Sequence, residues 1–381
     1  MGNNISDIID CFGCGVCARG CSRNIIHIRW NENGFYQPYI DEKDKCIDCG
    51  ICRDVCSFIH NDLALQYNEI HSYAAWSHDF ETHKKCSSGG VGFEVGRYLI
   101  ENGYKAIGVR YNVGKQRAEH FMANTVSDYW ESIGSKYIQS YTLDGWNEVN
   151  RDEKYLITGT PCQIDSFRRF MKRMRFDEDK FILLDFFCHG VPSIFALNKY
   201  IQIYSSKIGN IKSLTWRNKK AGWHDSWAME IKGDKSGSIY KLKTKGDIFY
   251  KLFLGDFCMN PACQKNCRFK YNRSSADIRI GDLWGETYKS NEDGVSAAIA
   301  FTSKGNKILH ACNCELIQHS FDIVAEGQMK ENCSKAPFSF IAWYMLKSKG
   351  FRNEYSWKFL FLAQKIYKKV KRTFIKERKI G

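Results

Sequence analysis

Two runs of cysteine near the N-terminus have the spacing of iron–sulfur cluster ligands. Each run has two residues between successive members of its first three cysteines and three residues before the fourth. Two residues between ligands let one tight loop wrap three thiolates around a cubane, while the fourth thiolate points into the neighbouring cluster. The spacing therefore predicts crossed ligation. Cluster one would take Cys11, Cys14, Cys17 and Cys56, and cluster two would take Cys46, Cys49, Cys52 and Cys21.

A pair of zinc sites is the alternative interpretation, because four cysteines also bind zinc tetrahedrally. Zinc motifs normally pair two ligands with two more about a dozen residues away, whereas each run here packs its four cysteines tightly together. Ser22 and Ser57 follow the fourth cysteines, where bacterial ferredoxins usually carry proline, but this departure removes no ligand. The segment resembles a bacterial two-cluster ferredoxin, so we expect two 4Fe-4S clusters in it.

Four later cysteines are candidate cluster ligands, and two of them lie where strands are expected to end. The apolar runs 155–158 and 181–185 each lead into a turn that carries a cysteine. In open α/β sheets, ligands and cofactors collect at the carboxyl ends of the strands. One hypothesis is a third 4Fe-4S cluster, and the alternative is a group of buried structural thiols, because cysteine packs as a small hydrophobic residue. The candidate ligands are Cys162, Cys188, Cys263 and Cys267.

The other patterns predict the elements that must position these residues. A polar stretch near residues 60–70 predicts a linker, and residues 72–76 alternate like a strand that enters a new domain. Residues 86–90 have the composition of a helix cap and precede an amphipathic helix over 91–103. A phosphate could bind the free N–H groups at that helix start, although ordinary capping explains the same residues. A β-rich stretch is expected from about 211 to 250.

Composition limits the classes of protein that the chain can form. Its 381 residues are 44% hydrophobic and carry a net charge of +14, which predicts a globular protein of two or three domains. The 17 cysteines, in a sequence without a recognisable export signal, predict a reducing cytoplasmic setting rather than a disulfide framework. The longest apolar stretch, 338–346, is too short to span a membrane. No fold motif for nucleic acid is visible, so no nucleic-acid partner is expected.

Five motifs in a fixed order carry a family resemblance. They are Ser87-Ser88-Gly89-Gly90-Val91, Gly134-Ser135-Lys136-Tyr137, Gly159-Thr160-Pro161-Cys162-Gln163, Cys188-His189-Gly190-Val191-Pro192 and Asp277-x3-Gly281-Asp282-x-Trp284-Gly285. Together with the cysteine runs, they resemble the coenzyme F420 hydrogenase/dehydrogenase beta-subunit family over about residues 1–305, in its bacterial branch associated with polysaccharide biosynthesis. Cys263 and Cys267 depart from the family, whose late cysteines usually stand two residues apart.

The resemblance implies a flavin, FAD, beside the iron–sulfur clusters. The flavin phosphates would face Ser87, Ser88, Gly89 and Gly90. Lys136 would supply a charge near the phosphates or the flavin ring, and Thr160 and Gln163 would lie near the isoalloxazine or the substrate. His189 is the candidate proton donor, with a neutral structural histidine as the alternative. Lys136 and His189 are therefore the candidate catalytic residues.

The function that the resemblance implies is an iron–sulfur flavoprotein oxidoreductase. A redox partner protein, a ferredoxin or a reductase, would exchange electrons with the clusters, and FAD would carry them to a small-molecule substrate in a two-electron step. A sugar or polysaccharide precursor is one candidate substrate, and nothing in the sequence identifies coenzyme F420 itself. The alternative is a flavin-free iron–sulfur electron carrier or docking partner of another enzyme.

The expected organisation is a small ferredoxin-like domain followed by an α/β flavin-binding reductase domain. The predicted divisions are 1–66 for the two-cluster domain, 70–155 and 156–325 for two parts of the reductase, and 326–381 for an extension. Residues 365–381 hold eight Lys or Arg and one Glu, interleaved with apolar residues at helical spacing. This basic tail predicts either contact with the inner face of an anionic membrane or a solvated helix.

Overall fold

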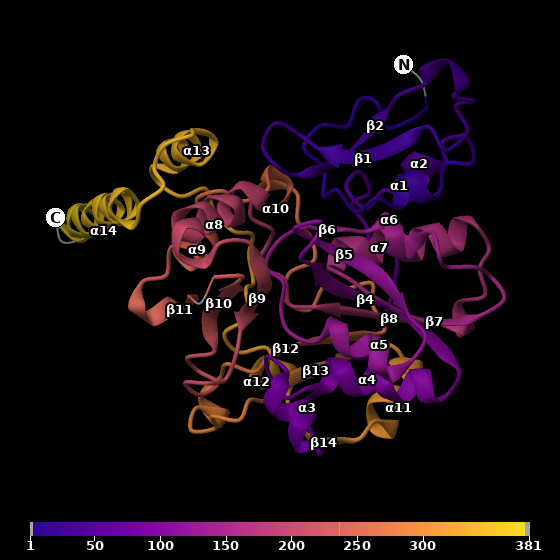
Figure 1. Cartoon of the computed structure of the whole chain (residues 1–381). Coiled ribbons are helices and arrows are strands. Elements are labelled where there is room, and N and C mark those ends of the chain that lie inside the picture. Colours follow the sequence, from indigo (N-terminus) through magenta and orange to yellow (C-terminus); the bar gives the residue numbers. More distant parts are fainter. Residues whose placement is uncertain (1–2, 236, 378–381) are drawn as a thin grey trace.

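The structure has three parts, which Figure 1 shows from one side. It is a computed structural model that describes residues 3–235 and 237–377. A small cysteine-rich domain precedes a large mixed sheet with helices on both faces, and a second, three-stranded sheet packs beside it with the C-terminal helices. The predicted fold class is therefore confirmed.

The cysteine-rich domain is built from two similar halves. Strand β1 (Ile26–Trp30) pairs antiparallel with β2 (Tyr36–Ile40), and each cysteine run contains one short helix, α1 (Val16–Arg19) or α2 (Ile51–Asp54). Glycine precedes each of these helices in the left-handed region of φ, at +74° for Gly15 and +75° for Gly50. A Cβ atom at Gly15 would also stand 2.3 Å from the hydroxyl oxygen of Thr142 on the next domain. Glycine is therefore required at that position.

The central sheet has nine strands in the order β14-β3-β13-β12-β8-β7-β4-β5-β6. The four middle strands β12, β8, β7 and β4 run parallel, and antiparallel pairs flank them. The strands are β3 (His71–Ser77), β4 (Tyr104–Asn112), β5 (Arg117–Ala123), β6 (Ser140–Tyr141), β7 (Lys154–Thr158), β8 (Phe181–Phe186), β12 (Ile278–Asp282), β13 (Ser296–Ala300) and β14 (Cys314–Gln318). The parallel middle places several strand ends at one edge of the sheet.

Helices cover both faces of this sheet because its middle strands are apolar on both sides. Helices α4 (Val91–Glu101) and α11 (Ser303–Ala311) pack on one face, in a core that includes Leu99 and Leu309. Helix α7 (Pro161–Arg173) packs on the other face through Ile164, Phe167 and Phe170. The shorter elements of this domain are α3 (Phe80–Lys85), α5 (Val126–Tyr129), the 3-10 turn η2 (Trp130–Ser132), α6 (Leu143–Trp146) and α12 (Phe321–Val324).

The second sheet has the order β11-β10-β9 and forms one large apolar core with its helices. Its strands are β9 (Ile211–Arg217), β10 (Trp227–Gly233) and β11 (Ser238–Leu242), and its helices are α8 (Ile194–Ile208), α9 (Ile248–Leu254), α10 (Pro261–Lys265), α13 (Ser339–Lys347) and α14 (Glu354–Glu377). The β-rich stretch that we expected to 250 ends earlier, because Asp247 caps α9 by accepting a hydrogen bond from the Tyr250 amide.

Three further observations concern the predicted organisation. The predicted division between 155 and 156 falls inside β7, and strands from both sides of it share the nine-stranded sheet. Over the described residues, no helix combines the length and the apolar character that crossing a membrane requires. The end of the predicted basic tail, 378–381, lies outside the described residues.

Candidate functional site

The structure brings the cysteines predicted for cluster one together. Burial is the main cause that raises the pKa of Cys11, and the nearby thiols of Cys56 and Cys14 raise it further. Burial likewise raises the pKa of Cys17, with Cys14, Cys56 and Cys11 among its neighbours. Cys56 from the second run thus sits with three cysteines of the first, as crossed ligation requires.

The cysteines predicted for cluster two also lie together. Burial raises the pKa of Cys52, and the neighbouring Cys49, Cys21 and Cys46 add to the shift. Cys49 is exposed and Cys52 is buried, so this group opens to solvent on one side. The roles of these eight cysteines as ligands stay predictions.

Hydrogen bonds hold cluster one's loop firmly on the central domain. The backbone oxygen of Cys14 accepts bonds from Trp146 Nε1 at 3.0 Å and from the Thr142 hydroxyl at 2.9 Å. The guanidinium of Arg19 donates to the backbone oxygen of Val149 at 3.0 Å. Most of these partners are buried, so the contact between the two domains is fixed rather than loose.

The four later cysteines, which we call the third set (Cys162, Cys188, Cys263 and Cys267), come from three separate segments and meet beside cluster one. Burial raises the pKa of Cys162, with Cys263, Cys188 and Cys14 of cluster one as thiol neighbours. Cys263 in turn has Cys188 and Cys267 as neighbours. The third set therefore adjoins the ferredoxin-like domain.

Two residues that sequence analysis did not assign lie against the third set. The ammonium of Lys270 donates to the backbone oxygens of Cys188 at 2.6 Å and His189 at 2.9 Å. Its charge also lowers the pKa of Cys188, against the larger effect of burial. The second is Cys333, which has Cys188 and Cys267 among its electrostatic neighbours.

Among the described residues, no three histidine, cysteine, aspartate or glutamate side chains converge to hold a single metal ion. The ligands of a 4Fe-4S cluster surround four irons rather than one ion. The groups of neighbouring thiols are therefore the relevant arrangement for cluster binding.

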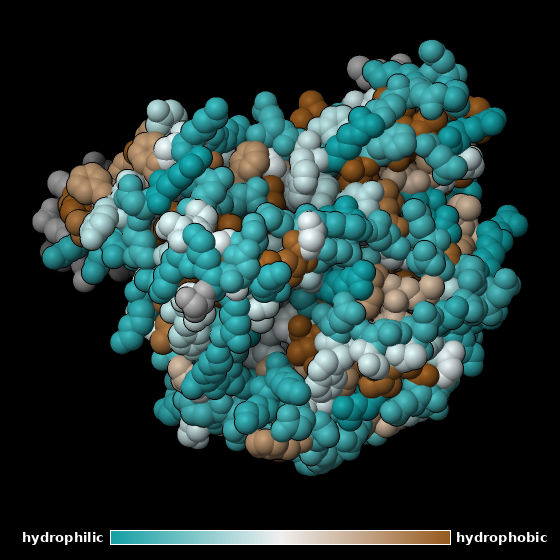
Figure 2. Space-filling model, viewed as in Figure 1, coloured by the Kyte–Doolittle hydropathy of each residue, from teal (hydrophilic) through white to brown (hydrophobic). Residues whose placement is uncertain are grey.

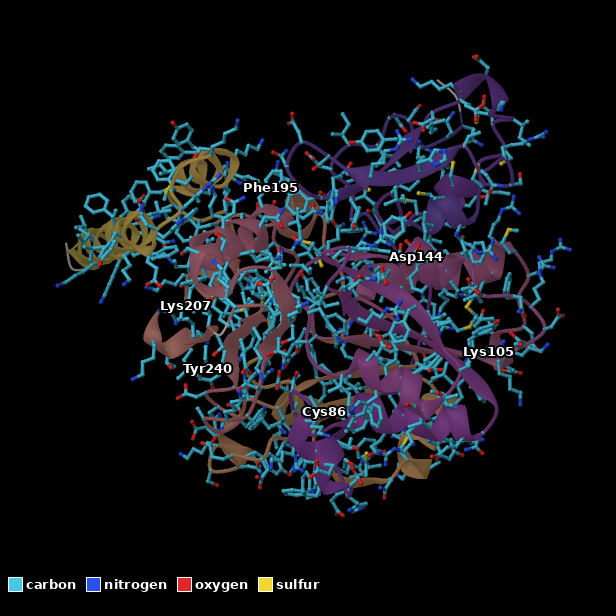
Figure 3. The ribbon with its side chains drawn as sticks, in the orientation of Figure 1. Cys86, Lys105, Asp144, Phe195, Lys207 and Tyr240 are labelled. Carbon is cyan, nitrogen blue, oxygen red and sulfur yellow. The ribbon has the colours of Figure 1, made fainter. Side chains whose placement is uncertain are left out.

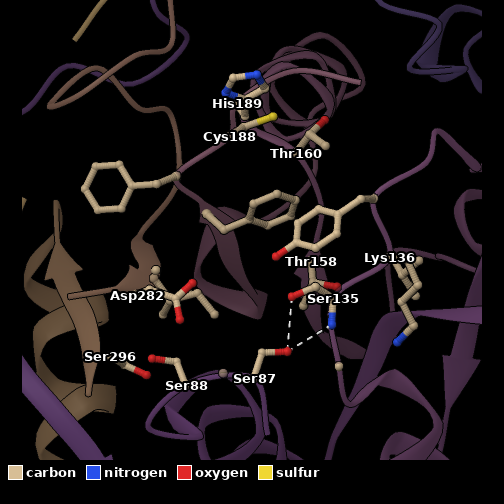
Figure 4. Close-up of a pocket in the computed structure, with 18 of the residues that line it drawn as sticks. Ser87, Ser88, Ser135, Lys136, Thr158, Thr160, Cys188, His189, Asp282 and Ser296 are labelled. Carbon is tan, nitrogen blue, oxygen red and sulfur yellow. Dashed lines mark hydrogen bonds between the residues drawn. The ribbon is translucent and has the colours of Figure 1, made fainter. Parts of the chain in front are cut away.

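A cavity of about 450 Å³ opens at the carboxyl edge of the parallel strands. Residues that end or follow β7, β8 and β12 line it, as expected for a ligand site of an open α/β sheet. Figure 4 shows Ser87, Ser88 and Ser135 toward one end and Cys188 with His189 toward the other. We call these ends the serine pole and the cysteine pole. The cysteine pole connects the cavity with the third set.

The serine pole is held by a network of short polar contacts. The amide and hydroxyl of Ser135 both donate to the Ser87 hydroxyl at 3.1 Å (Figure 4). The Ser88 hydroxyl donates to the backbone oxygen of Val295 at 2.8 Å. The ammonium of Lys219 donates to the Ser88 backbone oxygen at 2.7 Å, and burial lowers the pKa of Lys219 to about 8. Cys86, labelled in Figure 3, follows α3 and lines the cavity.

Sequence analysis predicted a helix cap at residues 86–90, but the serines there do not cap α4. Gly90 is the N-cap residue at φ +88°, and no side chain bonds to the first turn of the helix. Gly89 does not line the cavity, since its position is packed against the backbone of Ala75 and Ser296. The start of α4 beside the cavity thus offers N–H groups without a side-chain cap.

Lys136 lines the cavity, but its ammonium is engaged. It donates to the backbone oxygens of Ser132 at 2.7 Å and Ile133 at 3.0 Å, at the end of η2. Burial lowers the pKa of Lys136 to about 7. The side chain therefore fixes the loop that carries Ser135 and Tyr137.

Thr160 and Gln163 also line the cavity, and together they form the capping box of α7. The Thr160 amide donates to Gln163 Oε1 at 2.8 Å. Their polar groups are thus used first to start the helix that carries Cys162.

Aromatic side chains that sequence analysis did not assign to the site form one wall of the cavity. Tyr137 and Trp227 stack with their ring centres 5.1 Å apart at an angle of 7°. The buried guanidinium of Arg217 lies over Trp227 and pairs with Asp282 at 2.6 Å. Trp227 and Asp282 line the cavity, so the wall combines flat apolar surface with a paired charge.

His189 stands at the cysteine pole with both ring nitrogens in contact with a side chain. Nε2 lies 2.8 Å from Asp256 Oδ1, and Nδ1 lies 2.7 Å from the sulfur of Met329. Asp256 has φ +60°, an uncommon conformation for a residue other than glycine. The carboxylate thus orients the imidazole toward the cavity edge.

Comparison with known proteins identifies two segments of the chain. Residues 152–319 match the family described as the C-terminal part of the beta subunit of coenzyme F420 hydrogenase/dehydrogenase. Residues 10–58 match a 4Fe-4S dicluster domain.

A chain in the xenon-derivatised F420-reducing NiFe hydrogenase complex from Methanosarcina barkeri is similar in structure. Its TM-score is 0.47 at 18% sequence identity, over 68% of this chain and 85% of that chain. No curated protein matches the sequence.

Proposed function

Because residues 152–319 match the C-terminal part of the coenzyme F420 hydrogenase/dehydrogenase beta subunit and residues 10–58 match a 4Fe-4S dicluster domain, we propose that this chain is a three-cluster flavoenzyme. The dicluster domain and the family make it an iron–sulfur protein of an oxidoreductase family. The finer proposal is that electrons pass from the dicluster domain through the third set to FAD in the cavity.

The observation that carries the proposal is the continuous series of thiols. Cys14 of cluster one is an electrostatic neighbour of Cys162, which neighbours Cys188, and Cys188 lines the cavity. Ser57 strengthens this junction, since its hydroxyl donates to the Cys162 backbone oxygen at 3.0 Å. An electron-transfer route needs such closely spaced groups between its entry and the reacting site.

The residues at the cavity fit a flavin dinucleotide. The serine pole offers the uncapped N–H groups of α4 for phosphates. The flat wall of Tyr137 and Trp227 suits an aromatic ring system. A volume of about 450 Å³ lies within the range of cofactor pockets.

When bound, FAD supplies the conversion between one-electron and two-electron transfer. The chain's own residues would bind and orient it. Ser87 and Ser88 would position the phosphates, and Asp256 would hold His189 so that its imidazole can exchange a proton with a substrate at the cavity edge. Lys136 would act through the position of its loop, because its ammonium already bonds to backbone oxygens.

The partners follow from the two ends of the route. The exposed side of cluster two would receive a ferredoxin or a reductase, and the cavity would take a small molecule such as a sugar or polysaccharide precursor. All 17 cysteines are free, in keeping with the proposed cytoplasmic setting. We also propose the divisions 1–66, 70–155, 156–325 and 326–381 as parts of the chain, with the middle two sharing one sheet.

The deciding experiment measures iron, acid-labile sulfide and flavin per chain on protein purified without oxygen. We expect about twelve iron and one flavin for the native sequence. Cys263→Ser should lower iron to about eight and leave the electron paramagnetic resonance signals of the dicluster domain in place. Cys312→Ser is the matched control, because Cys312 is buried in the core on the α4 face.

About eight iron and no flavin in the native protein would contradict the proposal. The chain would then be a flavin-free electron carrier or docking partner, and the third set would be structural thiols. Twelve iron without flavin would retain the third cluster and reject the cavity as a flavin site.

A further inference from the structure

Helix α14 has an apolar face that the rest of the described chain does not cover. Its inner side is buried. Trp357 is fully enclosed, and the ring of Phe361 meets that of Phe257 edge to face with their centres 5.6 Å apart. Its outer side carries Tyr355 at 81% exposure and Phe359 at 75%. The helix is thus already anchored by one face, and the opposite face is left for another contact.

The exposed apolar residues of α14 follow helical spacing. Tyr355, Phe359, Leu362, Ile366 and Val370 recur every three or four residues, so they form one stripe along the helix. At 1.5 Å per residue, the stripe is about 22 Å long. A continuous line of this length is unusual on an exposed surface, where apolar residues normally stand singly.

Neighbouring helix α13 extends this apolar surface. Phe340 is 68% exposed and Tyr344 is 67% exposed, one helical turn apart. Figure 1 shows α13 and α14 side by side at the edge of the molecule, and Figure 2 shows brown and tan atoms among teal ones there. The two helices together form the surface that we call the α13–α14 face.

The charged residues around this face are almost all positive. Between residues 339 and 371, eight Lys or Arg accompany a single acid, Glu354. Glu354 is already paired with Lys241 at 3.0 Å and Lys358 at 3.3 Å. Lys365 is exposed beside the stripe. The α13–α14 face is therefore apolar along its centre and cationic at its side.

We propose that the α13–α14 face binds the surface of an anionic lipid membrane. An amphipathic helix of this kind places its apolar stripe among the acyl chains and its lysines among the headgroups. A second copy of the chain is disfavoured as the occupant, because pairing two such faces would bring like charges together. This anchoring would hold the electron-transfer site at the membrane and is independent of the proposed redox function.

The binding can be measured by sedimentation of the full-length, cluster-loaded protein with vesicles. One set of vesicles contains phosphatidylcholine alone and the other contains phosphatidylglycerol as well. We expect sedimentation only with the phosphatidylglycerol vesicles, and less of it at high salt. Light scattering of the same sample without vesicles gives its oligomeric state.

Two variants test the two components of the face. Phe359→Ala with Leu362→Ala and Ile366→Ala removes the stripe and should weaken partition at least about tenfold. Lys365→Gln should weaken it roughly fivefold. The controls are Phe80→Ala, an exposed aromatic on α3, and Lys84→Gln, which removes the same charge elsewhere. Iron content must match the native protein in every variant.

Absence of sedimentation with either vesicle would overturn the proposal. Equal binding to both vesicles, or a loss of binding as large in the controls as in the variants, would also overturn it. A dimer that the stripe variant converts to a monomer would assign the α13–α14 face to a second copy instead.

Discussion

The dicluster domain and the third set beside the cavity both bring cysteine thiols together, but the thiols of each come from the sequence in a different way. In the dicluster domain, a loop of a few residues supplies three neighbouring thiols, and short helices α1 and α2 fix each loop. The third set takes its four thiols from three segments spread over about 100 residues, carried to one place by β7, β8 and α10. The first group is a property of local sequence, and the second is a property of the folded sheet.

This difference predicts how each group of thiols responds to substitutions in the chain. A cysteine of the dicluster domain can be lost without disturbing the central sheet, since the bonds from the Cys14 loop to that domain are accepted by a backbone oxygen, which a side-chain substitution keeps. The third set must instead respond to changes in residues that touch none of its thiols. The predictions below are ordered from the largest expected effect to the smallest.

Crossed ligation gives the largest effect and tests whether the dicluster domain is one local unit. Cys56→Ser and Cys11→Ser should each remove about four iron per chain and leave the same remaining paramagnetic signal. Cys49→Ser should remove as much iron but leave the other signal. Iron analysis and electron paramagnetic resonance on the reduced proteins measure both. If Cys56→Ser instead matched Cys49→Ser, each run would bind its own cluster.

The local character of the dicluster domain also explains why it could be predicted. The spacing of Cys11 to Cys21 contains the loop geometry, and the match of residues 10–58 to a dicluster domain agrees with it. Strands over 72–76 and 181–185 could be predicted in the same way, because their apolar patterns are continuous in sequence. Helix α9 was missed, since its apolar run at 248–254 has no periodicity that separates a helix from a strand.

The cavity could be predicted only in part. Ser87, Ser88 and His189 stand in recognisable motifs and all line the cavity. Trp227 and Asp256 stand in no such motif. Trp227 lies in an alternating strand and Asp256 in a turn, and similar residues occur in many strands and turns. Lys270 follows the third set closely in sequence, yet its bonds to the backbone at Cys188 depend on tertiary packing.

A buried ion pair beside the third set tests its dependence on the sheet. Arg279 on β12 pairs with Asp185 on β8 at 2.7 Å, and both side chains are fully buried. Arg279→Met leaves the carboxylate without its charged partner and should lower the free energy of unfolding by about 3–5 kcal/mol. Urea unfolding followed by tryptophan fluorescence measures this loss.

The same variant distinguishes the two regions. Iron of the third set should fall in Arg279→Met, while the signals of the dicluster domain persist. The double variant Arg279→Met with Asp185→Leu removes both charges and should recover much of the stability. Equal loss of all clusters would show that the dicluster domain is not independent of the sheet.

The junction between the regions should be sensitive to acid through His120. Its ring packs on Trp146 with centres 4.6 Å apart, and burial lowers its pKa to about 4. The unfolded chain takes up a proton near pH 6.5, so it binds more protons than the folded chain between about pH 6.5 and 4. This group therefore reduces stability as pH falls through that window, by about 3 kcal/mol at its lower end.

His120→Gln removes the titration and keeps a donor toward the Thr158 backbone oxygen, which lies 3.2 Å from His120 Nε2. As pH falls from about 7 to 4.5, the unfolding free energy of the native protein should decrease more than that of the variant. His310→Gln, at an exposed position on α11, is the control. A pH-independent difference would contradict a neutral His120 in the folded protein.

The smallest predicted effect is at the aromatic wall of the cavity, which Tyr137 and Trp227 form. Trp227→Ala removes a stacking surface and should weaken FAD binding by about tenfold, whereas Trp227→Phe keeps an aromatic ring and should lose less. Titration of flavin-depleted protein, followed by flavin fluorescence, measures both. Trp30→Ala, on the stacked pair with Tyr36 in the dicluster domain, is the control. Iron should stay unchanged in Trp227→Ala because the wall supplies no thiol to the third set, so a loss of iron there would mean that the cavity and the third set fold as one unit.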